Sequence, residues 1–274
     1  MNKIGRLSKM VVSHTSPVSY ALPLGEFLLP LNDLIGKSFA LEFTGLIQCI
    51  ACGREIKKSF QQGYCFPCTR KLAQCDLCIL KPVLCHYHKG TCREPLWGET
   101  HCMIPHVVYL SNTSGLKIGI TRKNQVPTRW IDQGAVAAIP VFEVSTRRIS
   151  GIIEAEMGKS MSDRTSWQAM LKGGIPPLNL VAEKHKLITA TQDLLEKTRT
   201  EFPNEQINIV RSDEVFEFQY PVLKYPSKVT SLSFDKTPRI EGSLLGIKGQ
   251  YLIFDVGVVN MRNFGGYNLK LLLL

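Results

Sequence analysis

Apolar and polar residues alternate along two short stretches near the middle of the chain, residues 106–111 (HVVYLS) and 116–121 (LKIGIT). A period of two residues is typical of β-strands, and the Asn-Thr-Ser-Gly sequence between the stretches favours a turn. The pattern therefore predicts a β-hairpin. A polar loop and Pro127 follow. Because proline suits the first turn of a helix, we expect a short helix there that carries Arg129 and Trp130.

Two further elements follow this helix. Residues 135–145 (AVAAIPVFEVS) are mostly apolar and predict a third strand. Residues 147–161 (RRISGIIEAEMGKSM) place Ile153 and Met157 one helical turn apart, with Glu154 beside them, which predicts a second helix. The middle of the chain is therefore expected to have the order β-β-α-β-α.

Both ends of the chain show strand patterns. Residues 17–48 mix short apolar runs with glycine and proline, and residues 242–274 predict three strands separated by glycines. The segments LIGKSFALEFTGLI and LLGIKGQYLIFDVGVV share an order of leucine, glycine, strand and glycine, so we expect the two ends to pair in one sheet or barrel. Residues 178–202 have helical apolar spacing and are interpreted as a helix that packs rather than a site.

These patterns predict an α+β protein of 274 residues, 44% of them apolar, which is enough for a sizeable core. We expect an N-terminal β region over residues 1–48 and a cysteine-rich zinc-binding segment over residues 49–104. A small β-β-α-β-α core over residues 105–175 and a C-terminal helix plus β region over residues 176–274 complete the expected organisation.

The cysteines carry the most specific chemical signal. Cys49-x-x-Cys52 and Cys65-x-x-Cys68 are two zinc knuckles separated by twelve residues. Each knuckle supplies two thiolates from one tight turn, and zinc takes four ligands in a tetrahedron. Four thiolates close the coordination shell, so we predict a structural zinc here rather than a catalytic one.

A second structural zinc is expected at the knuckle Cys75-x-x-Cys78, with Cys85 and Cys92 as the favoured partners. The partners are ambiguous, because six residues can complete the site: Cys85, His86, His88, Cys92, His101 and Cys102. Among these, Cys102 is the first substitute. An iron–sulfur cluster on the same thiolates is the alternative, since ligand softness alone does not separate the two metals.

The charge of the chain favours a polyanionic partner. Lysine and arginine exceed aspartate and glutamate by 33 to 23, which gives a net charge of +10. Residues 49–130 hold twelve of the basic residues and four of the acidic ones, so the surplus is local. The N-terminus has no apolar run of signal-peptide length and no stretch predicts a membrane helix. We therefore expect a cytoplasmic protein with reduced cysteines and no membrane partner.

The predicted β-β-α-β-α order, together with particular residues, resembles the GIY-YIG endonuclease superfamily over about 60 residues. Val108-Tyr109-Leu110 corresponds to its first tyrosine motif and Lys117-Ile118-Gly119 to its second. Arg129 corresponds to the arginine of its first helix, and Glu154 to the metal-binding glutamate of its second. The whole chain also resembles a bacterial family in which a cysteine-rich segment precedes such a core.

The resemblance implies a phosphodiester-cleaving site. Glu154 would hold Mg²⁺ or Mn²⁺, Arg129 would neutralise the charge that develops on the phosphate, and Tyr109 would help to activate water. Lys117 stands where the family most often has a second tyrosine, and it is expected to act as a phosphate clamp or a base.

Three neighbouring residues are expected to contact the nucleic acid. These are Arg122 and Lys123, in or next to the loop after the hairpin, and Trp130, which can stack on a base or pack in the core. Two functions remain open from the sequence. One is a metal-dependent endonuclease, and the other is a non-catalytic zinc-containing module that binds DNA or RNA, for example structured RNA such as tRNA.

Overall fold

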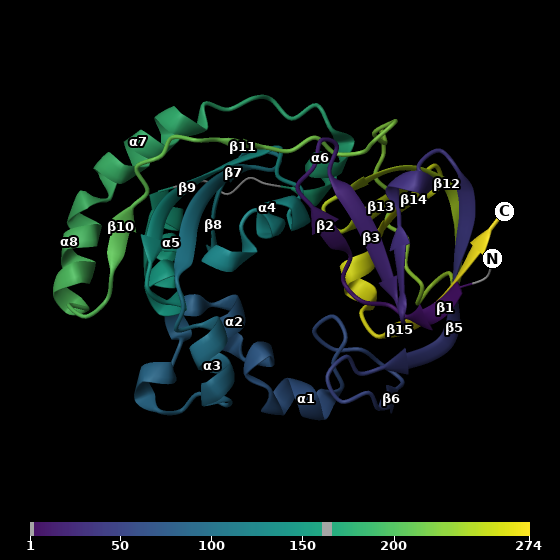
Figure 1. Ribbon diagram of the computed structural model, residues 1–274, viewed down its shortest axis with the longest axis horizontal. Coiled ribbons are helices and arrows are strands. Elements are labelled where there is room, and N and C mark those ends of the chain that lie inside the picture. Colours follow the sequence, from purple (N-terminus) through teal and green to yellow (C-terminus); the bar gives the residue numbers. More distant parts are fainter. Residues whose placement is uncertain (1–2, 161–165) are drawn as a thin grey trace.

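The computed structural model describes residues 3–160 and 166–274, and helices and strands are both abundant in them. The predicted α+β class is confirmed. The strands form three antiparallel sheets that, with the helices, are arranged in a ring in the view of Figure 1. No helix in these two ranges is long and apolar enough to cross a membrane.

The largest sheet joins the two ends of the chain. Its strands, in spatial order, are β1 (Lys3–Arg6), β15 (Tyr267–Leu273), β5 (Ser38–Gln48), β12 (Arg239–Lys248), β13 (Tyr251–Phe254) and β14 (Gly257–Asn260), and β6 (Glu55–Ile56) also pairs with β5. The two termini lie close together at one edge of it (Figure 1). The C-terminal region holds four strands where the glycine spacing predicts three, because Asp255 and Val256 form a two-residue turn between β13 and β14.

A three-stranded sheet packs against the largest one. It consists of β2 (Val11–Ser13), β3 (Ser19–Leu24) and β4 (Phe27–Pro30). Side chains alternate across β3, so that Tyr20, Leu22 and Leu24 are buried in the same apolar cluster as Phe39 of β5 and Leu269 of β15. The burial of these side chains holds the two sheets together.

The middle of the chain forms the remaining sheet, with the spatial order β10 (Ile207–Ile209), β9 (Ala137–Val144), β7 (His106–Asn112) and β8 (Leu116–Arg122), while β11 (Phe216–Glu217) also pairs with β9. Every residue of β7 is buried, because both faces are covered. Val108 and Leu110 belong to one apolar cluster, whereas Val107 and Tyr109 belong to the cluster that extends into the largest sheet. The alternating side chains of this strand are therefore buried in two different apolar clusters, one on each face of the sheet.

Eight α-helices accompany the sheets in the described residues: α1 (Phe66–Lys71), α2 (Leu77–Leu80), α3 (Pro95–His101), α4 (Thr128–Asp132), α5 (Arg147–Ser160), α6 (Trp167–Lys172), α7 (Leu180–Ala190) and α8 (Gln192–Glu201). Helix α5 follows the prediction up to Ser160, and residue 161 lies outside the described ranges. The single helix expected over residues 178–202 is two helices, α7 and α8. They part at Thr191, whose hydroxyl donates to the carbonyl oxygen of Leu187 at 2.8 Å.

The cysteine-rich segment is docked on α5. The guanidinium Nη2 of Arg147 donates to the carbonyl oxygen of Ile79 at 2.6 Å. Gly151 lets the 3-10 turn Pro82–Leu84 approach closely, since a Cβ added to Gly151 would lie 2.4 Å from Pro82 Cβ. The segment is therefore positioned by α5, although none of residues 66–102 belongs to the buried apolar clusters.

Candidate functional site

A cavity of about 680 Å³ lies beside the β7–β8 hairpin. The four residues predicted to be catalytic, Tyr109, Lys117, Arg129 and Glu154, all line it. They come from β7, β8, α4 and α5, so the pairing of two strands and the packing of two helices bring them together. The structure thus assembles the predicted residues around one space.

Tyr109 is fully buried, and its hydroxyl donates to Gln133 Oε1 at 2.6 Å. Its cross-strand partner is Gly119, and a Cβ added to Gly119 would lie 2.7 Å from Tyr109 Oη. The ring therefore occupies the space that a side chain at position 119 would take. Burial raises the pKa of Tyr109 to about 12, so that the hydroxyl stays protonated near neutral pH.

Glu154 is half-buried on α5, and lysine and arginine residues line the same cavity. Burial raises the pKa of its carboxyl group, while the charges of Arg147, Lys117 and Arg129 oppose this shift. Within residues 3–160 and 166–274, no ion pair joins Glu154 to Arg129. The carboxylate is thus close to three positive charges without being closed off by the arginine of α4.

Four further cations line this cavity. Arg122 was expected there, whereas Lys9, Arg147 and Arg262 were missed by the sequence reasoning. Arg147 precedes Glu154 by seven residues, or two helical turns, so the shared helix face was a signal that could have found it. Lys9 and Arg262 carry no such signal, because the pairing of the chain ends brings them close.

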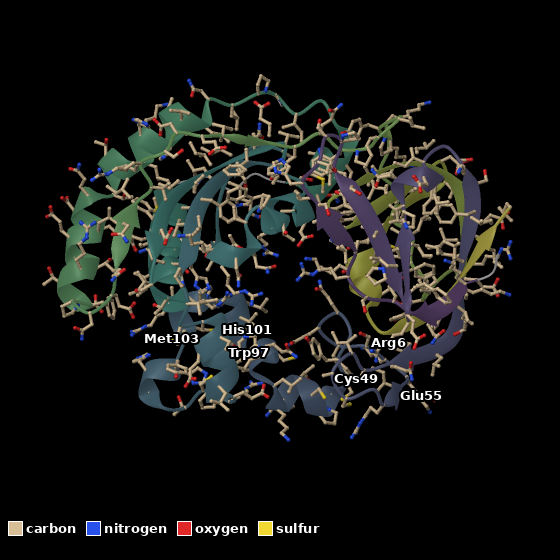
Figure 2. The ribbon with its side chains drawn as sticks, in the orientation of Figure 1. Arg6, Cys49, Glu55, Trp97, His101 and Met103 are labelled. Atoms are coloured by element: carbon tan, nitrogen blue, oxygen red, sulfur yellow. The ribbon has the colours of Figure 1, made fainter. Side chains whose placement is uncertain are left out.

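The site extends into a second cavity of about 690 Å³. The two cavities share the lining residues Lys9, Ile79, Leu80, Arg129 and Arg262, so they adjoin each other, and together they are called the basic groove below. Its walls come from the β7–β8 hairpin with α4 and α5, the cysteine-rich segment, and the segments that follow β1 and precede β15. Figure 2 shows nitrogen-ended side chains that project into the space enclosed by these three parts.

Two residues expected to contact nucleic acid lie elsewhere. Lys123 is not among the groove-lining residues, and its Nζ pairs with a carboxylate oxygen of Glu143 at 2.8 Å. Trp130 is fully buried, with its ring 5.5 Å from that of Tyr109 and 5.1 Å from that of Phe216. No face of the indole is available to a base, which corrects the stacking interpretation in favour of core packing.

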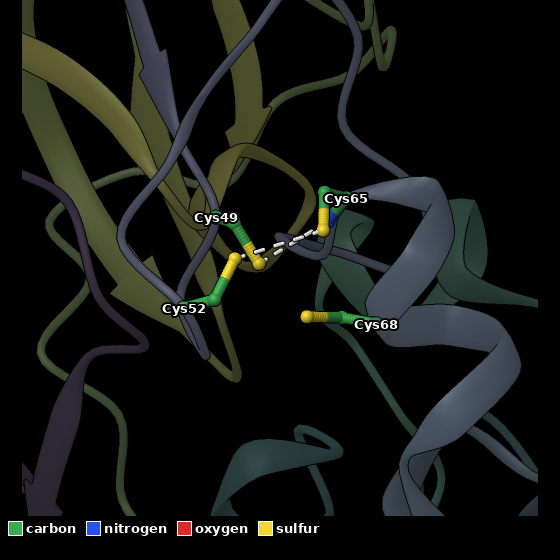
Figure 3. Close-up of side chains that lie close together, drawn as sticks. All are labelled: Cys49, Cys52, Cys65 and Cys68. Atoms are coloured by element: carbon green, nitrogen blue, oxygen red, sulfur yellow. Dashed lines mark hydrogen bonds between the residues drawn. The ribbon is translucent and has the colours of Figure 1, made fainter.

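The first predicted metal site is assembled. The sulfur atoms of Cys49, Cys52, Cys65 and Cys68 all lie within 4.8 Å of one another, with Cys49 and Cys65 buried (Figure 3). Burial alone would raise the pKa of Cys49, but backbone N–H groups, including that of Cys65, lower it to about 6. The four thiols form a candidate metal site with the donor set of structural zinc.

The second predicted set is not assembled as expected. Cys78, Cys85 and Cys92 line one small cavity, but Cys75 does not. Burial raises the pKa of Cys75 to about 11, while the charge of Arg93 opposes this shift.

Comparison with known proteins identifies a family. The model of the family described as "Protein of unknown function (DUF2797)" matches residues 36–269, which is most of the chain. The chain therefore belongs to this family. No curated protein and no solved structure is detectably similar to it.

Proposed function

We propose that this member of the DUF2797 family binds nucleic acid in the basic groove and cleaves a phosphodiester bond there with the help of a divalent metal ion. The observation that carries the proposal is the meeting of Glu154 with Arg129 and Lys117 in one cavity that three further arginines, Arg122, Arg147 and Arg262, also line. Clustered cations favour a polyanion, and a carboxylate among them offers the oxygen ligand that Mg²⁺ or Mn²⁺ prefers.

The roles of the side chains follow from their surroundings. Glu154 would hold the metal ion, which would polarise the phosphate. Arg129 lines both cavities, so it can contact the phosphate and neutralise the charge that develops on it. Lys117 lies within electrostatic reach of Glu154, which suits a clamp on the same phosphate. Tyr109 is held protonated and donates its hydroxyl hydrogen to Gln133, so its oxygen can orient a water molecule by accepting a hydrogen bond from it.

The succession of elements supports the same proposal. Strands β7 and β8, helix α4, strand β9 and helix α5 follow one another along the chain, and we propose that they form a core like that of the GIY-YIG superfamily. We therefore assign residues 105–175 as the catalytic core and expect the protein to act on nucleic acid in the cytoplasm. The cysteine-rich segment would close one side of the groove.

A second function is a nucleic-acid-binding module without catalysis. The observation that favours it is the raised pKa of Tyr109, because a tyrosine that keeps its proton is a poor base for activating water. This function needs the same groove and the same cations, but no metal at Glu154.

The two functions are separated by incubating the wild type and Glu154→Gln with panels of structured DNA and RNA in Mg²⁺ and in Mn²⁺. If the protein is an endonuclease, the wild type should cut the nucleic acid. The Glu154→Gln variant should bind the nucleic acid at least as tightly as the wild type without cutting it, because the variant lacks a charge that repels phosphate. If neither protein cuts and both bind equally, the binding module stands. If neither binds, both proposals fail.

A further inference from the structure

We infer that Cys78, Cys85, Cys92 and Cys102 bind a second metal ion of the zinc class. All four residues line one cavity of only about 10 Å³. Such a volume is close to that of a single water molecule, so the space suits one ion and not an organic ligand. Three of the four cysteines are buried and Cys92 is partly buried, which matches a closed structural site.

The four thiols come from separate turns of the segment. Cys78 lies in α2, Cys85 ends the 3-10 turn Pro82–Leu84, Cys92 follows the left-handed turn at Gly90, and Cys102 ends α3. A single ion would thus tie all the short elements of residues 77–102 together. This segment has no apolar core of its own, because none of its residues belongs to the three buried apolar clusters of the described chain.

Large apolar side chains of the segment point outward instead of forming a core. The exposed ones are Leu77, Leu80, Val83, Leu84 and Leu96. A segment that leaves its leucines in solvent needs another source of folding free energy, and a metal bound by four thiolates supplies it.

A competing ligand set, Asp76, Cys78 and His86, has donor atoms within 4.8 Å of one another, whereas no three of the four thiols gather that closely in the described residues. Asp76 is engaged elsewhere, because it accepts from the backbone N–H of Cys78 at 3.2 Å and pairs with Arg93 Nε at 2.5 Å. The Nδ1 of His86 is hydrogen-bonded to the hydroxyl of Thr91 at 2.7 Å. The hydrogen bond of His86 Nδ1 leaves its Nε2 able to bind a metal, so the assignment rests on the preference of zinc for thiolates over carboxylate and imidazole donors.

The surrounding charge suits four thiolates. Zinc with four thiolates carries a charge of about −2, and Arg93 lines the same cavity. On the other side, the backbone N–H of Arg147 donates to the carbonyl oxygen of Cys102 at 2.8 Å, and the Arg147 guanidinium reaches Ile79. The site therefore connects the cysteine-rich segment to the start of α5.

At this location the second ion would stabilise one wall of the basic groove. Ile79 and Leu80, which lie between Cys78 and Cys85 in the chain, line both cavities of the basic groove. Pro82 packs against Gly151, one turn before Glu154. The second ion would thus fix the wall of the groove that faces Glu154, whichever reaction occurs there.

The test compares Cys75, which the sequence spacing predicts as a ligand, with Cys102, which lines the cavity where Cys75 does not. Zinc per folded monomer is measured for the wild type, Cys102→Ser, Cys75→Ser and His86→Ala. We expect about two equivalents in the wild type, Cys75→Ser and His86→Ala, and about one in Cys102→Ser. Loss of one equivalent from Cys75→Ser with retention in Cys102→Ser would overturn the inference, and so would loss from His86→Ala.

Should Cys102→Ser fail to fold, Co²⁺ substitution of the wild type decides the question. We expect two equivalents of Co²⁺ to bind, both with the intense visible absorption of tetrahedral thiolate coordination. A second equivalent whose spectrum shows nitrogen or oxygen donors, or binding of a single equivalent, would contradict the four-thiolate site.

Discussion

The ring of Tyr109 lies across Gly119, its partner on the neighbouring strand, at a distance that excludes a side chain on Gly119. A Cβ added there would lie 2.7 Å from Tyr109 Oη and 2.8 Å from Cζ. The glycine therefore allows the tyrosine to reach Gln133 at the edge of the basic groove. One backbone position on β8 sets the place of a side chain on β7.

Gly119→Ala should displace the Tyr109 ring. We expect a loss of about 1–3 kcal/mol in the free energy of unfolding, because the ring is fully buried and overpacking forces it out of its rotamer. Chemical denaturation measures this. The control is Gly158→Ala on α5, where an added Cβ meets nothing within 4 Å and where alanine should stabilise the helix by about 0.5–1 kcal/mol. Equal stability of the two variants would contradict the packing described.

Gly151→Ala should push the cysteine-rich segment away from α5. An added Cβ would lie 2.4 Å from Pro82 Cβ and 2.9 Å from the backbone nitrogen of Val83. We expect faster limited proteolysis within residues 77–102, because the segment has no apolar core to hold it in place. Gly158→Ala, on the same helix, serves again as the control. Identical cleavage rates for the two variants would show that the contact does not position the segment.

His106 should make stability depend on pH. Burial lowers the pKa of its imidazole to about 4, from an ordinary value near 6.5. The unfolded state then binds a proton that the folded state does not, so stability falls as the pH drops from about 6.5 to 4. The loss reaches about 3 kcal/mol at most. His106→Phe should flatten this part of the pH profile of the unfolding free energy, and an unchanged slope would exclude the residue as its source.

Metal removal should unfold the cysteine-rich segment selectively. Structural zinc contributes folding free energy, whereas α7 and α8 are held by an apolar cluster that contains Leu180, Leu187 and Leu195. Hydrogen exchange after chelation should therefore show lost protection in residues 49–104 with protection retained in residues 180–201. Cys65→Ser should lose protection in residues 49–72 without a chelator. Uniform protection throughout would mean that metal is not needed for this fold.

Local sequence signals were sufficient where one segment determines its own structure. The hairpin of β7 and β8 followed from two alternating runs around a polar turn, and the first four-cysteine site followed from two tight knuckles. Placing Tyr109, Lys117, Arg129 and Glu154 beside one cavity also needed only neighbouring elements, together with a family resemblance.

Longer-range packing decided the remainder. Lys9 and Arg262 reach the groove because β15 lies between β1 and β5, a pairing across almost the whole chain. Trp130 is buried because Phe216, far along the sequence, covers it. Lys123 forms an ion pair with Glu143 on β9, and this contact depends on the packing of the sheet and not on the spacing of the two residues in the sequence.

Binding of nucleic acid in the basic groove is tested most directly by measuring how affinity depends on salt concentration in the wild type, in one arginine variant and in one lysine variant. Arg129 lines both cavities, whereas Lys123 is paired with Glu143 outside them, so Lys123→Ala is a charge-matched control for Arg129→Ala. With a labelled structured RNA, log K should fall against log salt, and Arg129→Ala should weaken binding and reduce the slope by about one unit. Lys123→Ala should leave both unchanged. A flat salt dependence in the wild type, or equal effects of the two variants, would contradict the account.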